Sequence, residues 1–251
     1  MKTFLLAVAA CTLAAFTSYG QTVSADSAAT PEFKPQARQF ATELNVNPFN
    51  GTISLNNSIN QLKFRYFTTH NFAVRLGFNG SRISASSENS NPYGTNSYRF
   101  SEERSSTTIG VNLGMEKHFA GTKRLSPYVG ADIIVENKSA SHDITSGQTE
   151  TNVTGAWRIT SYSSGYPPQT IMNFTERGYT RYGLNLVSGF DFYMAKSFFF
   201  GYEVNFGFSQ TNFHDIEVKQ SDMNYNNPDT KNTSFSFGPN LANGFRIGYV
   251  F

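Results

Sequence analysis

The sequence predicts an all-β fold: an eight-stranded antiparallel up-and-down transmembrane β-barrel with four long outward loops and three short periplasmic turns. Apolar and polar residues alternate with a period of two in eight successive segments. The connections between these segments alternate between short and long. Charged and aromatic residues each make up 15% of the 251 residues, fewer charges than the roughly 25% usual in soluble domains. Beyond the N-terminus no apolar run is long enough for a membrane helix.

The chain divides into three expected parts. Residues 1–20 have the basic start and apolar core of a secretory signal peptide, with the small residues Ser18 and Gly20 before the cleavage point. Residues 21–38, with Ala, Ser, Thr and two prolines, predict a flexible periplasmic lead-in. We expect the barrel itself to span residues 39–251.

Eight segments carry the alternation. The first is the weakest, because Pro48 limits its ladder of hydrogen bonds. The seventh is the clearest, with aromatic residues such as Phe200 on one face and polar residues such as Glu203 on the other. In chain order the segments are 44–46, 62–67, 72–79, 109–116, 129–136, 181–192, 198–208 and 235–251.

The connections give an independent indication of a barrel. Three are tight turns, at residues 68–71, 120–125 and 195–197. The others are long and polar, at about 50–60, 82–106, 139–178 and 210–232. Such sorting places both termini and the short turns in the periplasm and the long loops outside. A secreted soluble β-sandwich, the alternative fold, has no reason to sort its loops in this way.

Aromatic residues gather beside the three short turns. Rings at strand ends are typical of the membrane–water interface. We therefore expect an interfacial role for Phe67, Phe72, Phe119, Tyr128, Phe192, Tyr193 and Phe198.

The polar face of the segments is expected to line the barrel lumen. An eight-stranded barrel is just wide enough for its own side chains to fill, and buried charges persist when they are paired and hydrogen-bonded. The five basic and six acidic residues on this face therefore predict a structural ion-pair network that plugs the lumen; a narrow path for small solutes is the alternative. The residues are Glu43, Lys63, Arg65, Arg75, Glu116, Asp132, Glu136, Arg181, Asp191, Glu203 and Arg246.

The C-terminal segment ends in alternating apolar residues and a terminal aromatic residue. With the signal peptide and eight alternating segments, it resembles the small Gram-negative outer-membrane barrels of the OmpA, OmpX and OmpW type, and the porin-like outer-membrane barrel-domain proteins. The resemblance covers about residues 39–251 and implies that barrel-assembly machinery recognises the last strand. At the position of this signal where the family usually has a glycine, this chain has Arg246. The assembly signal would comprise Phe245, Ile247, Tyr249 and Phe251.

Enzymatic function has little support in the sequence. His142 and His214 each precede an aspartate in a predicted outer loop and could meet as a metal or acid–base site. Isolated His-Asp pairs in polar loops are more often solvated surface, and no His-x-Ser spacing indicates a lipid-modifying enzyme. We assign no catalytic, cofactor-binding or metal-binding residue.

The sequence thus predicts a non-enzymatic outer-membrane protein with a structural, envelope or surface-interaction role. A narrow porin-like channel is the second hypothesis and a lipid-modifying enzyme the third. A formal net charge of +2 and the lack of a phosphate-binding loop give no support for nucleic-acid partners. The expected partners are outer-membrane lipid and the assembly machinery, and a ligand at the long loops is left open.

Overall fold

The fold is described by a computed structural model. It covers residues 33–46, 59–91, 93, 98–163, 169–221, 223–224, 232–240 and 245–251. The predicted signal peptide, residues 1–20, lies outside the described residues. Within them every regular element is a β-strand, and no helix occurs that could span a membrane. The strand pairings are antiparallel, so the predicted all-β antiparallel fold is confirmed.

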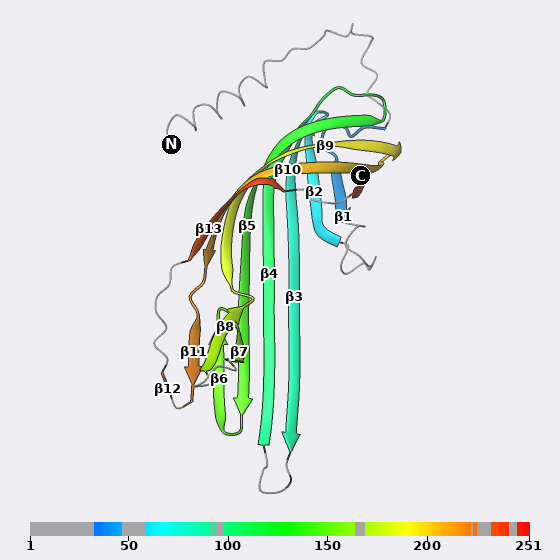
Figure 1. Ribbon diagram of the computed structural model, residues 1–251. Coiled ribbons are helices and arrows are strands. Elements are labelled where there is room, and N and C mark those ends of the chain that lie inside the picture. The colour runs from blue at the N-terminus through cyan, green and yellow to red at the C-terminus, as the bar shows by residue number, and fades with distance from the viewer. Residues whose placement is uncertain are drawn as a thin grey trace, which may run out of the picture. The chain divides into compact units, whose positions relative to one another are not determined.

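Eight of the described strands pair in a closed circuit. Each pairs with the next, and the last pairs with the first through Ala41 and Val250. Figure 1 shows β3, β4 and β5 side by side, with the shorter β1 and β2 beside β3. The strands of this ring, in order, are β1 (Phe40–Val46), β2 (Ile59–Thr69), β3 (Phe72–Asn91), β4 (Tyr98–His118), β5 (Leu125–Ser146), β9 (Tyr179–Ala195), β10 (Phe198–Phe213) and β14 (Phe245–Val250).

The three predicted turns are confirmed as short connections. β2 ends at Thr69 and β3 begins at Phe72, while β9 ends at Ala195 and β10 begins at Phe198. The connection from β4 to β5 is longer, at residues 119–124, but still short beside the connections at the other end. All three leave the same end of the ring, which we call the turn end.

The prediction that residues 82–106 form a loop is wrong for most of that segment. β3 and β4 continue as a paired hairpin as far as the pair Asn91 and Tyr98. Alternation could not reveal this hairpin, because the β3 side chains from Ser81 to Asn91 are exposed on both faces. Because neither face of this part of β3 is buried, its sequence does not alternate between apolar and polar residues.

The predicted loops at 139–178 and 210–232 also contain strands. β5 continues to Ser146 and pairs with β6 (Thr149–Thr154), which pairs with β11 (Glu217–Gln220). β12 (Met223–Asn224) pairs with β11, and β7 (Trp157–Ser163) pairs with β8 (Gln169–Thr175). We call these strands, together with the continuations of β3, β4 and β5 beyond the ring, the strand extension.

The last predicted segment, 235–251, is divided rather than continuous. Among the described residues, β13 (Thr233–Asn240) pairs only with β10, whereas β14 pairs with both β10 and β1. Residues 241–244, between these two strands, lie outside the described residues.

Register places one parity of every ring strand on the outside. Leu113 lies opposite Ile133, which lies opposite Leu184 on its other side. These three apolar side chains are 55%, 60% and 43% exposed. The ring thus turns an apolar surface outward, and its polar residues share the inner face.

Candidate functional site

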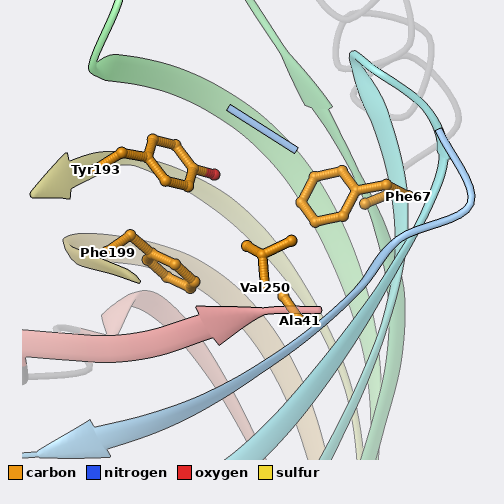
Figure 2. Packing of buried hydrophobic residues seen from close by; sticks show 6 residues of the cluster. Ala41, Phe67, Tyr193, Phe199 and Val250 are labelled. Carbon is orange, nitrogen blue, oxygen red and sulfur yellow. The ribbon is translucent and has the colours of Figure 1, made fainter. Parts of the chain in front are cut away.

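The interior of the ring is filled from the turn end by an apolar layer. Six side chains from six strands meet there, and Figure 2 shows five of them pointing toward one another. Arg65, the next inward residue of β2, places its guanidinium 4.7 Å from the centre of the Phe199 ring. The layer consists of Ala41, Phe67, Ala73, Tyr193, Phe199 and Val250.

This layer corrects the expected position of several aromatic residues. Phe67 and Tyr193 are fully buried, and Tyr128 is only 1% exposed. The side chains of all three point into the ring, so they cannot lie at a membrane–water interface on its outer surface. Phe119, by contrast, is about half exposed.

The residues just before β1 pack against this apolar layer. Phe33 packs against it, and the Arg124 guanidinium lies 4.2 Å from the centre of the Phe33 ring. The backbone N–H of Arg38 donates to the carbonyl of Phe67 at 2.7 Å, and the N–H of Phe67 donates to the carbonyl of Gln39 at 2.9 Å. The end of the predicted lead-in is therefore packed against the turn end.

Above the apolar layer, nine of the eleven predicted lumen residues form one connected set of ion pairs, which we call the charge layer. All nine are buried. Four are basic and five acidic, and each makes at least one contact of 3.5 Å or less with an opposite charge. The nine residues are Glu43, Lys63, Arg65, Arg75, Glu116, Asp132, Asp191, Glu203 and Arg246.

Glu116 contacts two arginines that the strand register places opposite each other. Arg65 on β2 lies directly opposite Arg75 on β3. One oxygen of Glu116 lies 2.8 Å from Arg65 and the other lies 3.0 Å from Arg75. The like charges therefore share a carboxylate from β4 that sits between them.

Glu203 and Asp191 connect the opposite wall. Glu203 on β10 contacts Arg75 at 2.8 Å and Lys63 at 3.2 Å. Asp191 on β9 contacts Arg65 and Arg246, each at 2.7 Å. The charge layer thus runs across the interior rather than along one wall.

A glycine makes room for one of these pairs. A Cβ atom at Gly201 would lie 2.9 Å from both the Arg246 guanidinium and the Asp191 carboxylate. Only a residue without a side chain leaves both groups in place.

Two predicted lumen residues form a separate pair farther from the turns. Arg181 pairs with Glu136, and the hydroxyl of Tyr179 donates to the same carboxylate at 2.6 Å. The amide of Asn79 donates to its other oxygen at 3.2 Å.

Next to the charge layer along the inner face lies a cavity of about 460 Å³, whose wall includes Glu136 and Arg181. Its wall includes six carboxamide side chains, which come from β1, β2, β3, β4, β9 and β10. They belong to Asn45, Gln61, Asn79, Asn112, Asn185 and Asn205.

Comparison with known proteins decides the family. The model of the "Putative OmpA-OmpF-like porin family" matches residues 45–247, most of the chain. The chain belongs to this family. The predicted identification as an OmpA-like, porin-like outer-membrane β-barrel is therefore confirmed at the level of the family. No curated protein matches the chain. The N-terminal β-barrel domain of Pseudomonas aeruginosa OprF is similar at 12% identity, covering 86% of this chain and all of that one, with a TM-score of 0.34.

Two further residues of this porin-family chain contact the charge layer, and the sequence alone did not assign either of them to the lumen. The Tyr128 hydroxyl donates to Glu203 at 2.6 Å. His118 is buried, with one ring nitrogen 3.0 Å from Glu116 and the other 2.9 Å from the Ser126 hydroxyl. Tyr128 and His118 share the inward parity of the charged residues on their own strands, so parity alone could have found them.

The two His-Asp pairs have separate partners in the strand extension and beside it. His142 is buried and lies 2.8 Å from Glu102, and its other ring nitrogen accepts the backbone N–H of Arg158. His214 lies 3.0 Å from the Thr180 hydroxyl. Among the described residues, no group of three or more potential ligands could hold a metal ion.

Proposed function

We propose that the ring is an eight-stranded transmembrane barrel in a Gram-negative outer membrane, with the turn end and both termini in the periplasm. Membership of the porin-like family and the outward apolar face support this placement. The strand extension would then project outside the cell, where its polar strands could meet other surfaces.

We propose a structural or surface-interaction role without catalysis and without a steady pore. The observation that carries this proposal is the charge layer, in which nine buried charged residues from all eight strands of the ring cross the interior. The apolar layer below it adds a second barrier on the periplasmic side. Paired charges resist displacement because a lone charge in such a site is costly.

Single-channel recording in planar bilayers tests this role. The purified protein should show no steady conductance. Glu203→Gln removes a carboxylate that contacts Lys63 and Arg75, so we expect intermittent openings in that variant. Glu150→Gln, at an exposed position in the strand extension, is the matched control and should stay silent.

Two outcomes would contradict the proposal. Steady open conductance of the unaltered protein would favour the second candidate, a narrow channel, which the cavity above the charge layer and the porin family itself both support. Silence of both Glu203→Gln and Arg75→Met would show that the charge layer is not what closes the interior.

We also propose that the assembly machinery recognises β14 and the residue after it. The four side chains of the expected signal share one face, and all are between 44% and 61% exposed. This leaves an apolar strand surface accessible to a partner; the residues are Phe245, Ile247, Tyr249 and Phe251.

A further inference from the structure

The cavity above the charge layer has the chemistry of a binding site for a neutral polar molecule. Six strands each contribute one carboxamide to its wall. Each carboxamide offers both donors and an acceptor, a combination that suits hydroxyl groups, which also donate and accept.

One of these side chains has an unused acceptor. Asn45 is 9% exposed, and its Oδ1 atom has no hydrogen-bond partner within the described part of the chain. A buried acceptor without a partner is costly. Because Asn45 lines the cavity, a donor on a bound molecule could satisfy it.

The charges of the wall argue against an ionic ligand. The charged side chains among the described lining residues are Glu136 and Arg181, and they pair with each other. Glu136 also accepts from Tyr179 and Asn79. A charged ligand would therefore enter a site whose described lining residues offer it no unpaired counter-charge.

The size of the cavity limits the ligand. A volume of about 460 Å³ falls within the range of small-molecule pockets, roughly 300–1,000 Å³. We propose that this cavity binds a small, uncharged, polyhydroxylated molecule of about monosaccharide size. The inference goes beyond the proposed function, since a closed barrel requires no ligand at this level.

Saturation-transfer NMR on the purified full-length protein tests the inference. The protein is held in a zwitterionic detergent that carries no sugar head group, and D-glucose is titrated against it. We expect saturable binding with a dissociation constant on the order of 1 mM, as befits a ligand with so few atoms. Gluconate and glucosamine, which carry a charge, should bind at least about tenfold more weakly.

Variants then locate the binding. Asn45→Leu removes the unused acceptor at similar volume and should weaken glucose binding about tenfold. Asn112→Leu changes a half-buried residue of β4 that also lines the cavity. It should also weaken glucose binding, and it replaces Asn45→Leu as the test if that variant does not fold. Asn137→Leu makes the same change on the exposed side of β5 and should leave binding unchanged.

Three results would overturn the inference: no saturable glucose binding by the unaltered protein, gluconate or glucosamine binding as tightly as glucose, or unchanged affinity in folded cavity variants. None of these bears on closure of the barrel, because conductance is measured without sugar. Conversely, a conducting barrel that binds glucose would refute the closed role alone.

Discussion

Single residues inside the ring are constrained by what faces them across it. Arg65 and Arg75 lie opposite each other, an arrangement that is destabilising on an exposed sheet. Here it is tolerated because Glu116 reaches both. The position of each charge is therefore set by its neighbours on other strands, and room for them is set by inward glycines.

Gly201→Val tests whether the space beside this glycine is needed for the Arg246 and Asp191 side chains. The added side chain would meet the Arg246 and Asp191 groups and the backbone of β9, so we expect destabilisation of about 1–3 kcal/mol from overpacking. Urea unfolding followed by tyrosine fluorescence measures it. Gly80→Val is the matched control, since the nearest atom to its Cβ would be 3.8 Å away; equal loss of stability in both variants would contradict the explanation.

At the scale of elements, the strand extension has a small interior of its own. His142 on β5 is buried beside Glu102, with Arg104 and Arg158 also near it. The indole N–H of Trp157 on β7 donates to the carbonyl of Ser105 on β4 at 2.9 Å. The β7–β8 hairpin is thus attached to the paired strands through polar contacts.

Acid should weaken this element. Burial lowers the pKa of His142 below its usual value of 6.5, more than the attraction of Glu102 raises it. The folded extension therefore binds this proton less readily than the unfolded chain. Its contribution to stability is complete above pH 6.5 and declines as the pH falls below that value.

Emission from Trp157, the chain's single tryptophan, reports on the extension. We expect a lower thermal midpoint at about pH 5.5 than at about pH 7.5. His142→Gln should abolish the difference. Identical midpoints of the unaltered protein at both pH values would refute this account.

The whole molecule is organised by the difference between the solvents on its surfaces. The ring has an apolar outside and a charged inside, whereas the strand extension is polar on faces that water reaches. The proposed orientation assigns lipid to the first surface and the cell exterior to the second. Single cysteines at three exposed positions distinguish these environments.

Intact cells are treated with a polymer-linked maleimide too large to cross the outer membrane. Ser86→Cys, on the β3 continuation, should be labelled. Lys196→Cys, in the turn between β9 and β10, should be labelled only after the outer membrane is permeabilised. Leu186→Cys, on the apolar face, should remain unlabelled in both cases.

The unaltered chain, whose only cysteine is Cys11, controls for background labelling. Labelling of Lys196→Cys in intact cells with protection of Ser86→Cys would reverse the orientation. Free reaction of Leu186→Cys would show that this face meets water rather than lipid.

Alternation by itself predicted the central part of each ring strand, the three short turns and an inward parity for the eleven charged residues, because side chains on a strand point to opposite faces. It did not predict that the segment 235–251 divides into β13 and β14. It failed for the strand extension, where both β3 faces are exposed and no contrast exists to be read. Only the tertiary structure decided that Glu116 contacts both Arg65 and Arg75, that Phe67 and Tyr193 fill the turn end, and that the acceptor of Asn45 has no partner among the described residues. These features depend on which side chains from different strands meet inside the ring, and alternation carries no information on such meetings.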